Sequence, residues 1–194
     1  WTAEYDARGN TIEKSYFGVD GEPLLNKDGV AKTTWKYNAT DKPTERAYFG
    51  VEGEPTLYKD GFWKWTWEYD KRGNEIQRAY FGTNGGPIGH GVEGYARRTQ
   101  TWDSRANVIE YSYFGVEGEP FLHSDGFASW TAEYDARGNT IEKSYFGVDG
   151  EPVLDTTTGC AKQTFDYDAF GAESNTTCFG LDGQPVPEPE SPTP

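Results

Sequence analysis

The sequence has little of the chemistry that enzymes and metalloproteins use. Its 194 residues include two histidines, two cysteines and no methionine. His90 and His123 lie in separate loop-like segments, and no serine or cysteine nucleophile accompanies them in a catalytic pattern. Zinc-ligand spacing is absent. Carboxylates recur at turn positions throughout the chain, as solvated turn residues do. We therefore expect a protein that is not an enzyme.

Positive charge and long apolar runs are also scarce. The chain has 18 Lys and Arg against 32 Asp and Glu, so its net charge is −14. Binding to a phosphate backbone requires clustered cations, and a nucleic-acid partner is not expected. No segment approaches the roughly 20 apolar residues of a membrane span, so membrane insertion is not expected either.

Aromatic residues are what the sequence has in abundance. They make up 16% of the chain, although hydrophobic residues of all kinds reach only 35%. A few large rings can bury the apolar area that many aliphatic side chains supply elsewhere. Aromatic enrichment is typical of β-strands, and the composition argues against disorder.

One pattern, Phe-Gly-x-[Asp/Glu/Asn]-Gly-x-Pro, recurs six times at intervals of 32 or 33 residues. The copies begin at Phe17, Phe49, Phe81, Phe114, Phe146 and Phe179. A fixed period of this kind indicates a repeat architecture in which each copy contacts mainly its neighbours. Residues 1–23 and 130–152 are identical, which indicates duplication.

Residues 127–159 show one copy clearly. A first strand pattern ends near Tyr134, and the turn formers of 135–139 follow it. The return strand places Ile141, Lys143 and Tyr145 on one face, because side chains alternate. Pro152 lacks the donor needed to extend a strand ladder. Each copy is therefore predicted to be a β-hairpin followed by a loop.

These observations predict an elongated all-β solenoid of β-hairpin repeats, with six copies of about 32 residues. The alternative is a closed, propeller-like ring. The repeat domain is expected over residues 1–185 and a Pro-rich linker over 186–194. The chain begins inside a strand pattern, so we expect a monomeric module of a larger, multidomain protein.

The two cysteines, Cys160 and Cys178, both belong to the last copy. By alignment Cys160 takes a position that is aromatic or Val elsewhere, and Cys178 replaces the Tyr of the Tyr-Phe-Gly motif. The two positions face each other near the open end of one predicted hairpin. We expect a disulfide that makes the last copy a cap, and hence an oxidising compartment. The alternative is two buried free thiols.

Tryptophan gathers in the second and third copies, at Trp35, Trp63, Trp65 and Trp67. Alternation in a strand places Trp63, Trp65 and Trp67 on one face. Such a stripe is either packed core or a platform on which sugar rings stack. A Gly-rich segment, 82–98, departs most from the pattern and is either a binding loop or a diverged linker.

Acidic residues also recur at matching positions, which makes calcium a candidate structural ion. Calcium takes clustered oxygen ligands. The candidate ligands are Asp20, Glu22, Asp28, Glu52, Glu54 and Asp60. Asp-Gly is also a common turn dipeptide, so a purely structural turn is the alternative, and no other cofactor is expected.

The predicted hairpin turns resemble a known repeat. The segments YDARGN, YDKRGN and WDSRAN resemble the YD repeat of rearrangement-hotspot (Rhs) proteins and teneurins, and YFGVDGEP is similar to the hairpins of cell-wall and glucan-binding repeats. The YD-like turns begin at Tyr5, Tyr69, Trp102 and Tyr134, whereas those at Tyr37 and Tyr167 depart from the consensus. The resemblance implies a secreted or surface-exposed array of β-hairpins.

For function, the sequence favours a non-catalytic extracellular module that binds a glycan or a surface protein and serves adhesion or recognition. The alternative is a passive structural stalk, or an Rhs-like shell segment without a ligand of its own.

Overall fold

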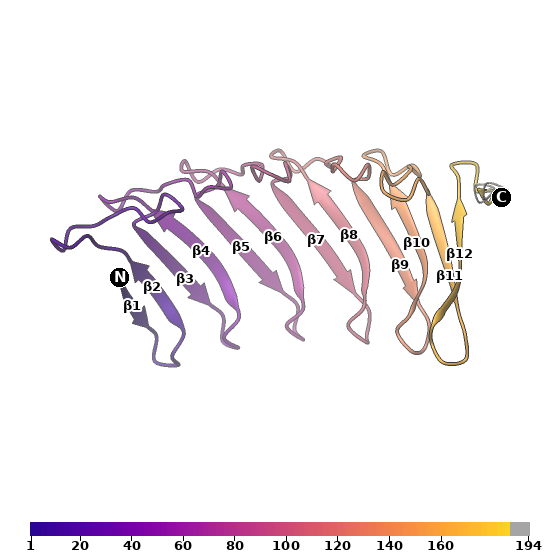
Figure 1. Cartoon of the computed structure of the whole chain (residues 1–194), viewed down its shortest axis with the longest axis horizontal. Helices are drawn as coiled ribbons and strands as arrows, with labels where there is room; N and C mark the ends of the chain where they lie inside the picture. The colour runs from indigo at the N-terminus through magenta and orange to yellow at the C-terminus, as the bar shows by residue number, and fades with distance from the viewer. Residues whose placement is uncertain (187–194) are drawn as a thin grey trace, which may run out of the picture. The chain divides into compact units, whose positions relative to one another are not determined.

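The computed structural model describes residues 1–186, and these form twelve antiparallel strands in six hairpins (Figure 1). The strands are β1 (Thr2–Tyr5), β2 (Thr11–Ser15), β3 (Lys32–Tyr37), β4 (Pro43–Phe49), β5 (Lys64–Tyr69), β6 (Glu75–Phe81), β7 (Arg97–Trp102), β8 (Val108–Phe114), β9 (Ser129–Tyr134), β10 (Thr140–Phe146), β11 (Lys162–Tyr167) and β12 (Glu173–Phe179). Their order is open, β1 to β12, and each strand pairs with its sequence neighbour. The predicted all-β hairpin repeat is confirmed, and the closed ring is wrong. Most of the predicted 186–194 linker lies outside the described residues.

The chain divides into two compact units. The first comprises Trp1–Gln100 and Tyr113–Glu119, and the second comprises Thr101–Ser112 and Pro120–Pro194. In the first unit the largest fully buried side chains include Tyr48 and Phe62, and in the second unit Phe127 and Tyr145 are buried. Loop residues therefore close over strand tyrosines to form each core.

Each hairpin turn is stabilised by the residue that follows the strand Tyr or Trp, which is Asn38 in the second copy and an aspartate in the other five. The Asp6 carboxylate accepts hydrogen bonds from the backbone N–H groups of Arg8 and Asn10, both at 2.9 Å. The Asn10 side chain donates a third at 3.0 Å. Gly9 adopts a φ of 88°, which only glycine tolerates without strain. The YD-like consensus is thus a self-capped turn.

In four copies the strand tyrosine before the turn ties the copy to the one before it, whereas the fourth copy has Trp102 at this position. The Tyr37 hydroxyl donates a hydrogen bond of 2.8 Å to the Thr11 carbonyl, and Tyr69 does the same to Pro43. In the second unit Tyr134 bonds the Val108 carbonyl at 2.8 Å. We call these bonds the tyrosine latches. They make the turn motif an element that joins repeats.

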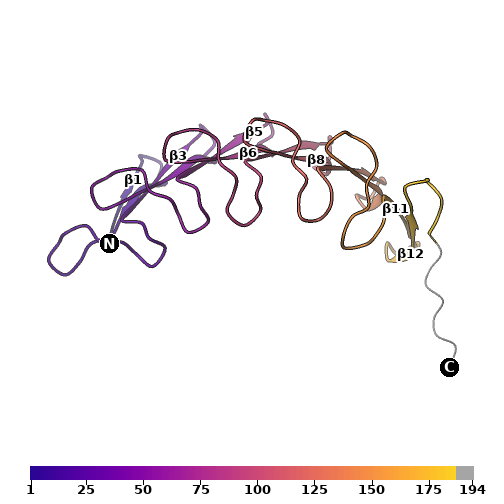
Figure 2. The ribbon, with the colours of Figure 1, turned by 90° about the horizontal axis from the view of Figure 1, so that it is seen from above.

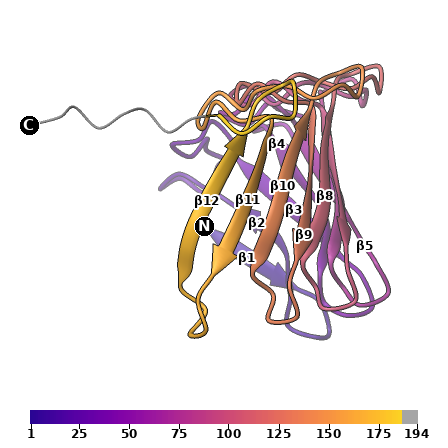
Figure 3. The same ribbon diagram turned by 90° about the vertical axis from the view of Figure 1, so that its right-hand side faces the viewer.

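The Phe-Gly-x-x-Gly-x-Pro motif forms a second turn at the opposite end of the strands (Figures 1 and 3). The Gly50 N–H donates to the Glu54 carbonyl at 2.9 Å, and Phe49 forms an isolated bridge with Pro55. A further turn then leads to the next hairpin, so within each unit neighbouring copies present similar loops side by side (Figure 2). The described residues contain no helix long and apolar enough to cross a membrane.

Candidate functional site

The strands of the first unit present two chemically different faces. On one face Lys32 lies 3.6 Å from the Glu13 carboxylate, and Lys36 and Lys64 lie 2.8 and 3.3 Å from that of Glu45. We call this the ion-pair face, because each of these three cations has a carboxylate partner. Such exposed pairs contribute little to stability.

The other face combines tryptophans with cations. Trp35, Arg46 and Trp65 are successive cross-strand partners on β3, β4 and β5, and Trp67 is paired with Arg78 on β6. We call this surface the aromatic face. All five side chains are half-buried.

The cations of the aromatic face stack on rings. The Arg46 guanidinium lies 5.2 Å from the Trp35 ring centroid and 5.1 Å from that of Tyr48. Arg78 lies 5.2 Å from Trp65 and 5.8 Å from Trp67. These distances are those of cation–π contacts. Both guanidinium groups are thereby packed against the rings.

Lys14 extends the aromatic face on β2. Its ammonium lies 4.7 Å from the Trp1 ring and 5.2 Å from the Tyr16 ring. Among residues 1–186, neither Lys14 nor Arg46 forms an ion pair with a carboxylate. The Nε–H groups of Arg46 and Arg78 are buried and donate no hydrogen bond within the part of the chain described. Arg78 differs from Arg46 by its 2.9 Å contact with Glu75.

The second unit repeats the arrangement once. The Lys143 ammonium lies 4.7 Å from the Trp130 ring and 4.9 Å from the Tyr145 ring. Burial among these rings lowers the pKa of Lys143 and raises that of Tyr145 to about 12. Trp130 also stacks on Tyr111 at 5.6 Å.

The prediction that Trp63 shares a face with Trp65 and Trp67 is wrong. The Trp63 ring meets Phe49 edge-on at 6.1 Å, and the Lys64 ammonium lies 5.2 Å from it. Trp63 precedes β5 in a bend, so strand alternation does not extend back to it. Trp65 and Trp67 do lie together, with ring centroids 4.7 Å apart. Trp35 joins them through Arg46.

The residues considered for calcium are engaged in turns or ion pairs. Asp20 accepts the Glu22 backbone N–H at 3.1 Å, and Glu54 accepts that of Glu52 at 3.0 Å. Asp28 lies 3.4 Å from the Lys59 ammonium, and the Asp60 backbone carbonyl accepts the Gly91 N–H at 2.7 Å. Over residues 1–186 no three His, Cys, Asp or Glu side chains gather to hold a metal ion. The calcium site stays a prediction.

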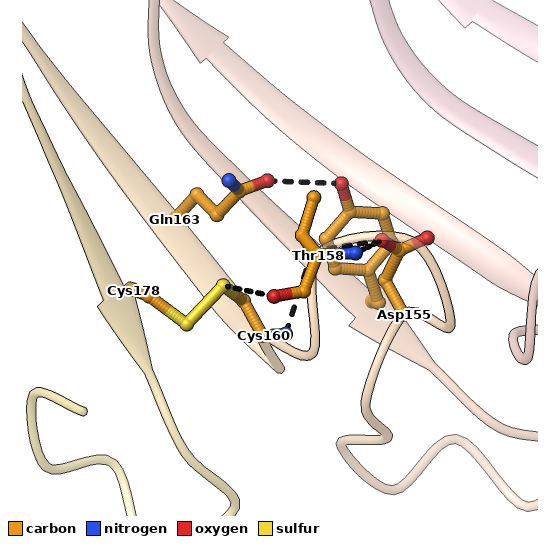
Figure 4. The surroundings of a disulfide bond; sticks show 6 residues. Asp155, Thr158, Cys160, Gln163 and Cys178 are labelled. Atoms are coloured by element: carbon orange, nitrogen blue, oxygen red, sulfur yellow. Dashed lines mark hydrogen bonds between the residues drawn. A yellow bond between two sulfur atoms is a disulfide. The ribbon is translucent and has the colours of Figure 1, made fainter. Parts of the chain in front are cut away.

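Cys160 and Cys178 form a disulfide that ties the loop before β11 to β12 (Figure 4). The same two positions hold contacting rings in earlier hairpins: Phe62 and Tyr80 at 5.0 Å, and Phe127 and Tyr145 at 5.1 Å. The disulfide therefore takes the place of an aromatic core pair.

Each histidine lies in a loop and accepts backbone hydrogen bonds through its Nδ1. The His90 ring packs 4.8 Å from Tyr80 and 5.4 Å from Phe62, and its Nδ1 accepts the backbone N–H of Val92 and Glu93. Buried His123 lies 3.1 Å from the Asp125 carboxylate within one turn. The Gly-rich segment around His90 thus packs against the core.

Three cavities lie between successive Phe-Gly turns, a feature that the sequence did not predict. Two in the first unit measure about 180 and 350 Å³, and one in the second unit measures about 180 Å³. Each is walled by the Phe and Pro of one copy and by glycines of the next; Phe81, Pro87 and Gly115 line the largest.

The cations of the aromatic face were also missed. A signal for them exists in the alignment of the copies. The position two residues before the Tyr of Tyr-Phe-Gly holds a cation in four of six copies, at Lys14, Arg46, Arg78 and Lys143. Only the register of the strands shows that these cations meet the tryptophans.

Comparison with known proteins gives likeness in structure only. The chain matches no family profile and no protein of curated function. It is similar to a chain in the structure of the Photorhabdus luminescens Tc holotoxin pore carrying a TccC3 mutation, with a TM-score of 0.48 and 14% identity over 91% of this chain and 10% of the other. A crystal structure of TcdB2-TccC3 gives a TM-score of 0.47 and 15% identity over 95% of this chain and 11% of the other. The chain spans about a tenth of the length of these solved chains.

Proposed function

We propose that this chain is a non-catalytic, extracellular repeat module of a larger protein, and that its aromatic face binds a glycan. The observation that carries the proposal is the row Trp35, Arg46 and Trp65 across three adjacent strands. Flat rings supported by a rigid sheet suit the apolar faces of sugar rings, and a guanidinium edge suits their oxygens. A glycan bound there would lie across the strands.

The extracellular part of the proposal is supported by the disulfide. A bond between Cys160 and Cys178 persists where the surroundings are oxidising, as outside the cell. A cell-surface setting and a role in adhesion or recognition belong to the same proposal.

Tryptophan fluorescence titrated with a panel of soluble glycans tests the binding. Trp67→Ala, on the aromatic face, is expected to reduce the affinity at least severalfold. Trp63→Phe is the matched control, because Trp63 packs on Phe49 away from this face. Equal losses in the two variants, or no saturable response of the parent chain to any glycan, would show the proposal to be wrong.

The tyrosine latches favour a second function, that of a structural spacer or shell segment. Four of them are described, from Tyr37, Tyr69, Tyr134 and Tyr167. Bonds repeated from copy to copy hold an array stiff whether or not it binds anything. A glycan panel without response, together with unfolding that is sensitive to latch removal, would select the spacer.

A further inference from the structure

The charges of the first unit are sorted between the two faces of its strands. Lys32, Lys36 and Lys64 are neutralised by carboxylates on the ion-pair face. Lys14 and Arg46 point to the other face and contact rings instead. A chain of net charge −14 therefore keeps uncompensated positive groups on one surface. Such a surface is complementary to a ligand that carries negative charge.

These cations follow the period of the repeat. Lys14, Arg46 and Arg78 stand on β2, β4 and β6, that is, on every second strand. Neighbouring strands are about 4.8 Å apart, and Arg46 pairs through Trp65 with Tyr80, so each cation stands two residues, about 7 Å, further along its strand than the one before. Successive cation-bearing positions are therefore about 12 Å apart. That interval is comparable to the length of a disaccharide. The aromatic rings between them are placed where the intervening sugar faces would lie.

We propose that the glycan bound by the aromatic face is an acidic polysaccharide, in which a carboxylate recurs in step with Lys14, Arg46 and Arg78 while sugar rings stack on the tryptophans. This inference rests on the proposed glycan binding and adds the charge and the period of the ligand. Arg46 is the central contact, since its stacked guanidinium presents donors in a plane that a carboxylate matches. Arg78 shares its charge with Glu75 and contributes less.

Sugar stacking distinguishes this ligand from nucleic acid. Polyphosphates are held by dense clusters of cations, whereas here one cation per copy alternates with indole rings in an otherwise acidic protein. An acidic glycan with spaced carboxylates places less negative charge against the acidic loops. The expected ligand is therefore a polymer that contains uronate sugars.

The test uses calorimetric titration of the whole chain with polygalacturonate, with its carboxyl-reduced neutral form, and with a single-stranded DNA oligonucleotide. Polygalacturonate is expected to bind more tightly than the other two, and more weakly as salt is raised. Arg46→Gln is expected to raise the Kd for polygalacturonate about tenfold. Lys36→Gln is the matched control: it removes the same charge from the ion-pair face and is expected to leave the Kd within about twofold.

Arg46→Lys guards against a folding artefact. Lysine occupies this position at Lys14 and Lys143, so the variant is expected to fold and to retain most of the affinity. Equal binding of the neutral polymer, unaffected by Arg46→Gln, would overturn the acidic ligand and leave the glycan proposal standing. DNA bound as tightly as polygalacturonate would also overturn it. Binding of neither polymer would overturn the acidic ligand, and the fluorescence titration with the glycan panel would then decide the glycan proposal by itself.

Discussion

The disulfide of the last copy offers a sharp test of how these hairpins are stabilised. Cys160 and Cys178 are 18 residues apart in sequence, and closing a loop of that size contributes about 3 kcal/mol in the chain-entropy model. Reduction should therefore lower the free energy of unfolding by about 3 kcal/mol. For a chain of this size that corresponds to a melting temperature lower by roughly 6–12 °C.

A double variant that puts an aromatic pair at the two cysteine positions distinguishes the stabilisation by the covalent bond from that by aromatic packing. Cys160→Phe with Cys178→Tyr restores the pair that Phe127 and Tyr145 form at 5.1 Å. This variant should ignore reductant, and it should exceed Cys160→Ser with Cys178→Ser in stability by about 1 kcal/mol or more, because it regains an aromatic contact.

The assay is urea unfolding of the three proteins with and without a phosphine reductant, followed by tryptophan fluorescence. Hydrogen exchange over residues 162–179 adds a local readout, because opening can be confined to one hairpin. The reasoning is refuted if reductant leaves the unfolding of the parent chain unchanged, or if the restored aromatic pair is no more stable than the double serine variant.

The other predictions concern the turns, the latches and calcium. Ala106→Gly should stabilise the chain by about 1 kcal/mol in urea unfolding, because Ala106 adopts a φ of 65°; Asp41→Gly, at a φ of 60°, should gain less because it loses a hydrogen bond from Asn10. Tyr69→Phe should cost about 1 kcal/mol through loss of its 2.8 Å latch. The hydrogen bond from the Asn10 side chain lowers the pKa of Asp6. The stabilisation by the ionised Asp6 is therefore present above the unfolded pKa near 4 and is lost as the pH falls below it. The free energy of unfolding of Asp6→Asn should accordingly depend less on pH than that of the parent chain. A chelator should leave the melting temperature unchanged.

Each of these predictions has an outcome that contradicts it. Equal gains from the two glycine variants would show that backbone strain alone governs the turn. Parental stability of Tyr69→Phe would mean that water replaces the latch, and an unchanged pH slope in Asp6→Asn would remove the turn carboxylate as its source. A fall in melting temperature with chelator would instead support calcium as a structural ion.

The fold could be predicted from the sequence because its signals are local. A turn that needs a positive φ selects glycine, as at Gly138 with a φ of 90°, and alternation placed Lys143 and Tyr145 on one face. The departures were equally local: Trp63 stands outside its strand, so alternation did not apply to it. Strands and turns can therefore be predicted from the sequence wherever the residues of a single hairpin determine them.

The candidate site was only partly predictable, because it depends on register between strands. The tryptophans were evident from composition and spacing. That Arg46 lies opposite both Trp35 and Trp65 depends on which residues pair across β3, β4 and β5. A shift of register by one residue would send Arg46 to the ion-pair face. Sequence reasoning on single strands therefore cannot place a cation against the ring of a neighbouring strand.

The tyrosine latches all point the same way along the chain. Tyr37 reaches back 26 residues to Thr11, and Tyr134 reaches back 26 to Val108. At each latch the later copy in the sequence therefore donates the hydrogen bond to the earlier copy. During synthesis from the amino-terminal end, a hairpin that carries the latch tyrosine would bond to the hairpin made before it, so that assembly is directional at these four junctions. The latch would thus give folding a direction, in addition to joining copies in the folded protein.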